Sequence, residues 1–540
     1  MTADTDVLVV GAGPTGLTLA AQLSAYGVTA RIVDRQLDRV HESRALVMQP
    51  RSLEVLRGLG IAQRLVERGN DSVQLRVHFG NRVVGTRLFD IGLEDTAYPF
   101  LLFISQAETE AILNEHLAAR GMPVERGVEL IAFSTSAEEI TCTLRHADGR
   151  IERARCRYLV GCDGAHSTVR EGAGIAFEGG TYPQTFVLAD LEVDGELEPG
   201  AGHAFLGDRG ILLFFPLGVP ATWRIVGMRP SKDAHDLGQE TEQLSLEELQ
   251  RICDGFTGGT LSLRDPVWLT YFRLHHRQAA RYRTGRTFLA GDAAHVHSPA
   301  GAQGMNTGIQ DAWNLGWKLA LVARGIADPA LLDSYDPERL PVGRFVLRFT
   351  DRASTIATSD SAVVRLTRTR IAPLLLPPLL RFRKGRTFGF RTIAQLAISY
   401  RNSPAVEEDP SAPRIGPKAG DRLPDSRIIS GGRECWLHDA LAAPAFHLLL
   451  CGPVADWPAD QLVAMQERYG DLLAVHRLTR EPGPGILLDP SGKTLARLGA
   501  QQAVQYLVRP DGHIGFRSGG RDTLATARYL DRWLPRFGRR

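Results

Sequence analysis

The chain has 540 residues, of which 44% are apolar and 23% are charged, a composition typical of a globular protein rather than a disordered one. Its 63 Lys and Arg residues against 61 Asp and Glu residues give a net charge of +2, which excludes a strong general attraction to nucleic acid. A chain of this length exceeds what one hydrophobic core usually serves, so we expect two or three domains.

The cysteines and the apolar runs bear on the compartment. The six cysteines form no CxxC pair and no Cys/His zinc spacing, which favours free thiols in a reducing compartment and no bound metal. The first apolar run, Val7 to Val10, has the length of a strand and follows no basic segment, unlike a secretory signal. The most lipid-like run, Ile371 to Leu380, is far shorter than the ~20 residues of a membrane span and holds three prolines. We therefore expect a cytoplasmic protein without a membrane contact.

The N-terminal segment predicts a strand over 6–10, a helix over 14–27 and a second strand over 29–34. The turn between the first two, GAGPTG, has the GxGxxG spacing, whose glycines allow a tight turn, a close approach to a pyrophosphate and packing of the helix on the strand. Free N–H groups at the helix start favour the anion, and a carboxylate at the end of the second strand can accept from ribose hydroxyls. We expect a dinucleotide site rather than a merely structural turn, formed by Gly11, Gly13, Pro14, Thr15, Gly16 and Asp34.

A different pattern follows, with short strands close together. Residues 73–89 predict a hairpin around Gly80-Asn81, and residues 140–155 predict a second hairpin. Residues 186–228 hold several short apolar runs in succession, which predicts an antiparallel sheet unlike the N-terminal unit.

Two further motifs come where predicted strands end. In the run from Cys162 to Arg170, Asp163 either caps a helix and pairs with Arg170 or belongs to a site. A strand over 287–293 holds Gly291-Asp292, where Asp292 is either a solvated turn residue or a group that reaches the cofactor bound at the first turn. The small residues of 299–306 open a long helix, whose N-terminal partial positive charge favours an anionic flat ring.

Together these motifs resemble the class A flavoprotein aromatic hydroxylases, the single-component FAD monooxygenases of the p-hydroxybenzoate hydroxylase superfamily. The resemblance rests on the GxGxxG turn, on DGxxSxxR beginning at Asp163, and on GDAAH beginning at Gly291, and it covers about residues 5–350. The RYRTGRTFLAGDAAH run and the C-terminal YLVRPDGHIGFR are similar to the branch with phenol, pentachlorophenol and aromatic polyketide hydroxylases.

The resemblance implies an α/β fold of three parts. A Rossmann-like FAD-binding domain of the GR2 type would take residues 1–72, 100–183 and 277–360. An inserted antiparallel substrate-binding sheet would take 73–99 and 184–276, followed by a helical or linker region over 361–411. A thioredoxin-like α/β domain would take 412–540; its Cys435 stands alone without a CxxC partner, so we expect a structural role for this domain.

The resemblance also implies contacts to FAD beyond the first turn. Arg35 would lie beside the adenosine, Arg44 at the pyrophosphate and Gln106 along the ribityl chain. Asp163 and Asp292 would contact the same FAD. Its flavin ring would lie against the residues that begin the long helix. One departure is Ala302, where related chains commonly have glycine. The remaining expected contacts to the ring are Pro299, Gly304, Met305 and Asn306.

The activity implied is hydroxylation of a phenolic or polycyclic polyketide ring through a C4a-hydroperoxyflavin, with O2 and NADPH or NADH as cosubstrates, in a monomer or homodimer. The inserted sheet would shelter the ring, with Phe205, Leu213, Phe215, Pro216, Trp223, Pro299 and Ala300 as candidate walls. Strand alternation allows only one of Phe214 and Phe215 to face the pocket, and the sequence does not say which.

Three alternatives stay open at this point. The catalytic group is unknown; a phenol reacts better as its anion, so Arg224, Tyr271, His297 and Pro299 are candidates. The same scaffold also performs Baeyer–Villiger oxygen insertion. A protein of another class, one that binds flavin and aromatic ligands without turnover, would carry the same motifs.

Overall fold

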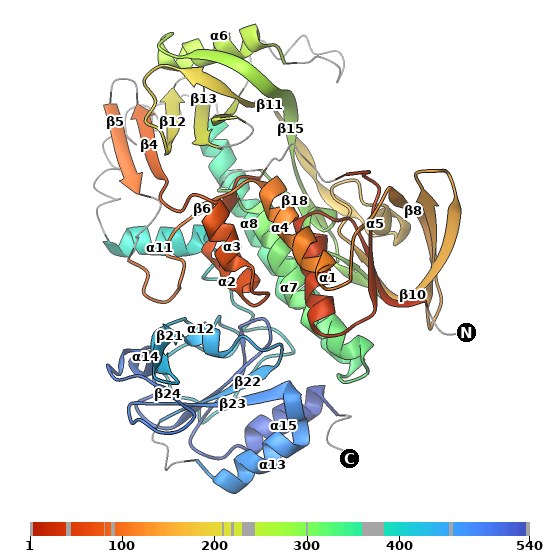
Figure 1. The fold of residues 1–540 in the computed structure, drawn as a ribbon, viewed down its shortest axis with the longest axis vertical. Helices are drawn as coiled ribbons and strands as arrows, with labels where there is room; N and C mark the ends of the chain where they lie inside the picture. The colour runs from red at the N-terminus through yellow and green to blue at the C-terminus, as the bar shows by residue number, and fades with distance from the viewer. Residues whose placement is uncertain are drawn as a thin grey trace.

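A computed structural model of the chain describes residues 4–38, 45–79, 82–87, 92–207, 210–217, 221–228, 244–298, 301–358, 383–452 and 457–535. Three large sheets organise these residues (Figure 1). The first carries the expected nucleotide-binding unit, the second is mostly antiparallel, and the third belongs to the C-terminal part of the chain.

The first sheet has a parallel centre in the order β17-β10-β1-β2-β7. Its central strand is buried from Val7 to Val10, because Val7, Leu8, Val9 and Val10 pack in the main apolar core. β16, β8 and β9 extend the sheet by antiparallel pairing. The strands are β1 (Thr5–Val10), β2 (Ala30–Asp34), β7 (Glu125–Arg126), β8 (Val128–Thr135), β9 (Ile140–His146), β10 (Ile151–Gly161), β16 (Arg283–Thr284) and β17 (Thr287–Leu289).

Helices cover this sheet, and α1 packs along α7 and α4. Pro14 at the first position starts α1, since its fixed backbone angle suits a helix start and it needs no N–H partner there. Ser105 starts α4 by accepting from the N–H of Glu108. The helices are α1 (Pro14–Ala25), α2 (Pro50–Arg57), α3 (Ala62–Arg68), α4 (Gln106–Ala118), α5 (Thr168–Gly172), α7 (Gly304–Ala323) and α8 (Tyr335–Thr358), with 3-10 turns η2 (Gly291–Ala293) and η3 (Pro329–Ser334).

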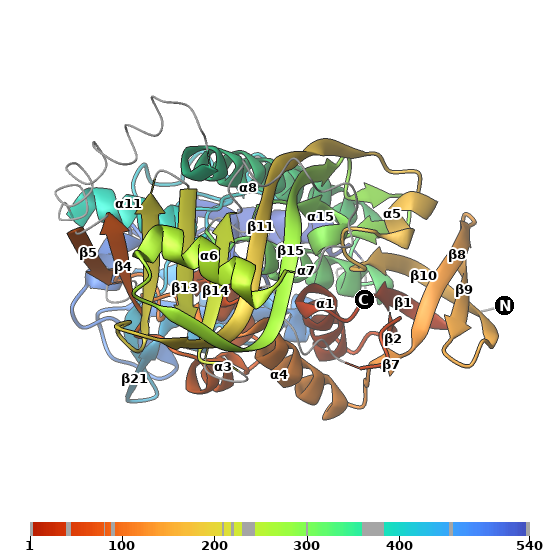
Figure 2. The ribbon, with the colours of Figure 1, turned by 90° about the horizontal axis from the view of Figure 1, so that it is seen from above.

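The second sheet has the order β18-β15-β11-β14-β13-β12-β4-β5. β11 and β15 are long antiparallel partners, each of 18 residues. α6 (Leu246–Thr257) covers one face, as the view from above shows (Figure 2). The strands are β4 (Gln74–Phe79), β5 (Arg82–Arg87), β11 (Phe177–Asp194), β12 (Ala201–Gly207), β13 (Gly210–Pro216), β14 (Trp223–Met228), β15 (Ser262–Ala279) and β18 (His295–Val296). The short pair β3 (Val47–Met48) and β6 (Leu102–Phe103) lies apart from it.

The third sheet has the order β19-β26-β25-β22-β23-β24-β20-β21, with β22, β23 and β24 parallel. Its buried strand β22 is apolar apart from His447. The elements are α11 (Arg383–Ile393), β19 (Glu407–Glu408), β20 (Arg427–Ser430), β21 (Arg433–Trp436), α12 (Leu437–Ala440), β22 (Phe446–Cys451), α13 (Ala459–Tyr469), η6 (Gly470–Leu472), β23 (Leu473–Thr479), β24 (Ile486–Leu488), α14 (Lys493–Arg497), β25 (Val504–Val508), β26 (Ile514–Gly519) and α15 (Leu524–Trp533).

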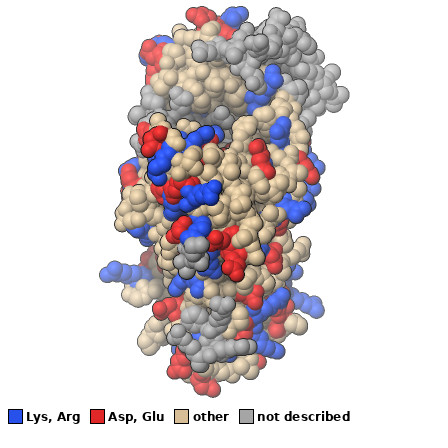
Figure 3. All heavy atoms as spheres, turned by 90° about the vertical axis from the view of Figure 1, so that its right-hand side faces the viewer, with Lys and Arg blue, Asp and Glu red and all other residues tan. Residues whose placement is uncertain are grey.

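The surface carries both signs of charge side by side. On the face seen in Figure 3, Lys and Arg atoms alternate with Asp and Glu atoms over the described residues. On this face the near-neutral net charge thus corresponds to charges of both signs lying side by side. Within the described ranges, none of the helices combines the length and the apolar character that crossing a membrane requires.

Candidate functional site

The three sequence motifs meet at one edge of the first sheet. Gly11 follows β1, Asp163 follows β10, Gly291 follows β17, and Asp34 ends β2. These four strands are parallel neighbours, so their carboxyl ends lie along the same edge. In open parallel sheets this edge is where ligands bind. We call it the motif edge.

The first turn has the shape that a pyrophosphate requires. Gly11 has φ +100°, and a Cβ there would lie 2.3 Å from the carbonyl oxygen of Cys162, so only glycine lets the ends of β1 and β10 approach. A Cβ on Gly13 would meet no atom within 4 Å, which leaves space at the start of α1. No side chain caps that helix. The first N–H groups of α1 therefore face an open place, which fits an anion.

Asp34 is held at the same edge by backbone N–H groups. Its Oδ2 accepts from the N–H of Ala12 at 2.6 Å, and its Oδ1 accepts from the N–H of Gln36 at 2.8 Å. This fixes the carboxylate beside the first turn with lone pairs left over for a ribose hydroxyl. Arg35 is exposed next to it.

Thr15 joins the first motif to the third. A Cβ built on Gly291 would lie 2.5 Å from Thr15 Oγ1, and one built on Gly308 would lie 2.3 Å from the same atom. The second turn of α7 and the end of β17 thus rest directly on the start of α1. Segments far apart in the sequence form one continuous surface, which can hold the two ends of a single elongated ligand.

The second motif is tied into this surface by Arg170. Ser167 is the N-cap of α5, and Asp163 supports it, since its Oδ1 accepts from Ser167 Oγ at 2.6 Å and its Oδ2 from the N–H of Val169 at 3.2 Å. Arg170 does not pair with Asp163; it donates to the carbonyl of Ala293 at 3.1 Å and to that of Ala165 at 2.9 Å. Burial raises the pKa of the Asp163 carboxyl. The capping alternative of the sequence analysis is therefore present, and the pairing with Arg170 is replaced by a link to the GDAAH segment.

The turn before α7 is fixed by two amide side chains. Asn306 donates from Nδ2 to the carbonyls of Val47 and Ala302, both at 2.9 Å, and its Oδ1 accepts from the N–H of Gln49 at 2.8 Å. Gln49 Nε2 donates to the carbonyl of Gly301 at 3.0 Å. Because the Asn306 side chain is used within the protein, the first turn of α7 offers a ligand its backbone N–H groups. Met305 is partly buried against the main core.

Two histidines beside this turn have different roles. His295 is 1% exposed, and its Nε2 lies 2.7 Å from Asp311 Oδ2, so it holds the β18 segment to α7. His297 Nδ1 donates to the carbonyl of Ser298 at 2.9 Å, which leaves Nε2 as an acceptor without a partner among the described residues. Its ring packs on Gly304. Burial lowers the pKa of His297 to about 4, so the ring is neutral at neutral pH.

The two faces of the second sheet differ in what they contact. Phe205, Trp223 and Tyr271 pack with the α6 side chains, and Pro216 pairs with Trp223 and shares its face. Phe214 is also on the α6 face. The opposite face carries Leu213 and Phe215, and Phe215 packs in a cluster with Ala302 before α7. We call this the α7 face. Alternation thus puts Phe215 on the face that packs with Ala302, while Phe205, Pro216, Trp223 and Tyr271 lie on the opposite face.

Arg224 lies on the α7 face, opposite Phe215 in the strand pairing. Its Nε and Nη2 donate to the two oxygens of Asp190, both at 2.7 Å. Arg224 is 2% exposed, and its Nη1 has no partner among the described residues. A buried guanidinium with one unused donor is an expensive arrangement unless something accepts from it.

The remaining expected residues are either engaged within the protein, exposed, or outside the described ranges. Gln106 begins α4 and donates from Nε2 to Glu110 at 2.9 Å. Asp292 is exposed at the motif edge. Arg44, Pro299 and Ala300 fall outside the described residues.

Comparisons with known proteins agree with this geometry. A family model described as the FAD binding domain matches residues 4–350. The chain belongs to the FAD binding domain family. It is 37% identical to 6-methylpretetramide 4-monooxygenase of Streptomyces rimosus, covering 97% of this chain and 92% of the relative, and 34% identical to pentachlorophenol 4-monooxygenase of Sphingobium chlorophenolicum, covering 96% and 94%.

Solved structures carry the likeness over the whole chain. Anhydrotetracycline hydroxylase from Streptomyces rimosus matches with a TM-score of 0.77 at 30% identity, covering 98% of this chain and 99% of that one. Aklavinone-11 hydroxylase in complex with FAD and aklavinone matches with a TM-score of 0.80 at 26% identity, covering 99% and 100%. The protein is therefore an FAD-dependent monooxygenase of mixed α/β fold, as the motifs predicted. The thioredoxin likeness of residues 412–540 and the domain boundaries stay predictions.

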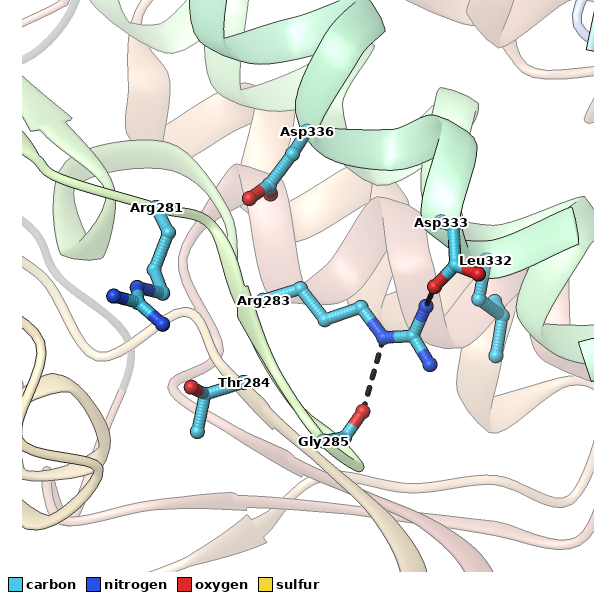
Figure 4. Close-up of a pocket in the computed structure, with 7 residues that line it drawn as sticks. All are labelled: Arg281, Arg283, Thr284, Gly285, Leu332, Asp333 and Asp336. Atoms are coloured by element: carbon cyan, nitrogen blue, oxygen red, sulfur yellow. Dashed lines mark hydrogen bonds and ion pairs between the residues drawn. The ribbon is translucent and has the colours of Figure 1, made fainter. Parts of the chain in front are cut away.

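A second hollow lies on the surface away from the motif edge. Figure 4 shows a pocket of about 390 Å³ around Arg281, Arg283 and Asp336. It lies where β17 begins, whereas the GDAAH turn follows the point where β17 ends. Arg283 is already engaged there by the carbonyl of Gly285 at 2.9 Å and by Asp333. At the motif edge, by contrast, the backbone leaves room beside Gly13 and uncapped N–H groups at the start of α1.

Two residues that hold the candidate site in place were not predicted from the sequence. Gln49 holds the turn before α7, yet its only sequence signal was its place before Pro50 at a helix start. Asp311 accepts from the N–H of Gly291 at 3.1 Å and from His295, and in the sequence it was one polar residue inside an amphipathic helix. Both act across long sequence separations, which no local pattern reports.

Proposed function

We propose that the protein hydroxylates a phenolic or polycyclic aromatic ring held between the α7 face of the second sheet and the first turn of α7. Its relatives are named for 6-methylpretetramide and pentachlorophenol, and a structural neighbour was solved with aklavinone. The observation that carries the proposal is the α7 face itself, where Phe215 pairs across the strands with buried Arg224, whose Nη1 has no hydrogen-bond partner among the described residues.

The cofactor contacts follow from the motif edge. The N–H groups at the start of α1, with Gly13 as the open position, would hold the pyrophosphate, and Asp34 would accept from the ribose. Backbone N–H groups of Gly304, Met305 and Asn306 would face the ring edge. Bound FAD, reduced by NADH or NADPH, supplies the activation of O2. We further propose that the enzyme works in the cytoplasm as a monomer or homodimer.

The side chains around the ring have separate tasks. Phe215 and Leu213 offer apolar surface to a flat substrate and exclude water from the place where oxygen is transferred. Arg224 Nη1 donates to a substrate oxygen and favours its anionic form, which makes a phenol more reactive toward an electrophilic oxygen. His297 Nε2 would accept a hydrogen bond from the substrate. A pKa of about 4 makes this ring a poor general base at neutral pH.

A turnover assay tests the proposal. Simple phenols and polycyclic phenols are compared for NADH and NADPH consumption, with isotopically labelled O2 and mass spectrometry of the product. We expect one labelled oxygen on an intact ring. Oxygen inserted between a carbonyl carbon and its neighbouring carbon, giving an ester or a ring-expanded lactone, would indicate Baeyer–Villiger chemistry instead, and ligand binding without reductant consumption would indicate a non-catalytic binder.

A further inference from the structure

The C-terminal domain reaches the flavin-binding part of the chain through the turn between β25 and β26, residues 509–513. Figure 1 shows this domain, in blue, below α2 and the lower end of α7. Asp511 accepts from Trp317 Nε1 and Asn314 Nδ2, each at 3.3 Å, so the turn docks on α7. Its backbone carbonyl also accepts from Arg51 Nη2 at 2.7 Å, which adds α2 to the contact.

Four charged side chains meet at this junction. Arg509 donates from Nη1 and Nη2 to the two oxygens of Glu338 on α8, at 2.6 and 2.8 Å. Lys318 on α7 donates to Glu338 at 2.7 Å, and Arg509 also pairs with Asp511. These side chains are at most 2% exposed. We call Lys318, Glu338, Arg509 and Asp511 the interdomain charge cluster.

The cluster is neutral only when all four members are present. Arg509 holds the pKa values of Glu338 and Asp511 below their usual range, although burial acts in the opposite direction. Burial lowers the pKa of Lys318 to about 8, which still leaves it charged at neutral pH. The two positive and two negative charges cancel. Removing Arg509 would leave an uncompensated negative charge in a dry interior, which proteins avoid by rearranging.

One route leads from this cluster to the GDAAH segment. Arg339, next to Glu338, donates to Asp311 Oδ1 at 2.6 Å, to the carbonyl of Thr307 at 3.1 Å and to Tyr400 OH at 2.9 Å. Asp311 in turn holds the N–H of Gly291 and His295. The ring centroids of Tyr400 and of His513, in the C-terminal turn, are 4.2 Å apart.

A second route leads to the turn before α7. Arg51, held by the carbonyl of Asp511, is two residues from Gln49 in the sequence. Gln49 holds Asn306 and the carbonyl of Gly301. The side chains of Arg339, Asp311, Arg51, Gln49 and Asn306 on these routes are buried and hydrogen-bonded. We infer that a shift of α7, α8 or α2 at the C-terminal junction is carried along them to the residues proposed to face the flavin ring.

We propose that Arg509 is a positioning residue for the FAD site, and that the C-terminal domain sets the geometry of that site without touching the cofactor. The inference rests on FAD binding at the motif edge and is independent of the substrate. It assigns to the RPDGH turn a role in cofactor binding that needs no redox cysteine.

The test measures FAD binding rather than turnover. Apoprotein of Arg509→Met is titrated with FAD by flavin fluorescence, and the visible absorption spectrum of the bound flavin is recorded. Arg509→Lys keeps the charge, and Arg401→Met is the matched control, because Arg401 also pairs with an aspartate of the C-terminal domain but is exposed. We expect R509M to raise the dissociation constant for FAD about tenfold or more and to alter the spectrum, R509K to restore most of both, and R401M to stay within about twofold.

The outcomes separate positioning from bulk stability. A role in stability alone would lower the melting temperature of R509M apoprotein and leave the affinity and spectrum of the folded fraction unchanged, which would overturn the proposal. Should R509M not fold, Asp511→Asn carries the same expectation, and normal FAD affinity and spectrum in D511N would overturn it too. Failure of the aromatic substrate assay leaves these measurements untouched, so the two proposals fail separately.

Discussion

The motif edge and the α7 face of the second sheet contribute to one proposed site by different physical means. At the edge the backbone provides the site: Gly11 lets two strands approach, and N–H groups at helix starts face open space. On the α7 face, the side chains of Phe215 and Arg224 project from regular strands. A backbone site tolerates few substitutions, whereas a side-chain site changes its ligand when residues change. This difference explains how one scaffold keeps FAD and varies its substrate.

The largest effect is expected at the edge, from Gly11→Ala. Its Cβ would lie 2.3 Å from the Cys162 carbonyl oxygen at φ +100°. We expect a loss of stability of about 3 kcal/mol or more together with loss of FAD binding, measured by unfolding of the apoprotein and by FAD titration.

Gly13→Ala is the matched control, because its Cβ meets no atom of the protein within 4 Å. We expect the apoprotein to unfold within about 0.5 kcal/mol of the parent while FAD binds about tenfold more weakly, since the methyl group takes space meant for pyrophosphate. Parent-like FAD affinity in G13A would place the pyrophosphate elsewhere.

Phe214 and Phe215, on opposite faces of β13, test which face of the second sheet binds the substrate. Phe214→Ala removes a fully buried ring from the core under α6 and should cost about 3–5 kcal/mol in unfolding free energy. Phe215→Ala, on the α7 face, should raise KM for an aromatic substrate about tenfold with FAD affinity unchanged. Steady-state kinetics and denaturant unfolding measure the two effects. If Phe214→Ala raised KM and Phe215→Ala lowered the unfolding free energy instead, the substrate would bind on the other face.

The sequence predicted the motif edge well because each of its parts is local. A GxGxxG turn, an acidic strand end and a GDAAH turn each carry their chemistry within a few residues. It could not choose between Phe214 and Phe215, since alternation gives two faces and the partner helix α6 is far along the chain. It also missed Glu338 and Arg509, whose pairing spans 171 positions. A glycine turn can be predicted from a few neighbouring residues, whereas side-chain contacts such as that of Glu338 with Arg509 depend on how the sheets and helices assemble.

A smaller effect concerns the whole molecule in acid. Burial lowers the pKa values of His297, His476 and His513 from 6.5 to about 4. The folded state therefore binds fewer protons than the unfolded chain between these values, so stability falls as pH falls through that window, by at most about 1.4 kcal/mol per pH unit for each ring and by less for the partly exposed His297 and His476. Urea unfolding at neutral pH and near about pH 5 checks this, and His513→Asn should reduce the slope. A flat profile would contradict the buried neutral state of these rings.

The smallest effect returns to the flavin turn. Ala302 has φ +53°, a conformation that costs a residue with a Cβ about 1 kcal/mol. Ala302→Gly should therefore stabilise the apoprotein by about 0.5–1 kcal/mol, reduced by the lost methyl contact with the Phe215 cluster. A thermal unfolding scan measures it, and a destabilised variant would show that the methyl contact outweighs the backbone strain.

A crystal structure of the FAD complex tests the central claim most directly. The account predicts the pyrophosphate within hydrogen-bond distance of the N–H groups at the start of α1, beside Gly13, and the flavin ring against the first turn of α7, with the α7 face of the second sheet above it. A flavin bound away from Gly304–Asn306, or a pyrophosphate away from Gly13, would contradict it.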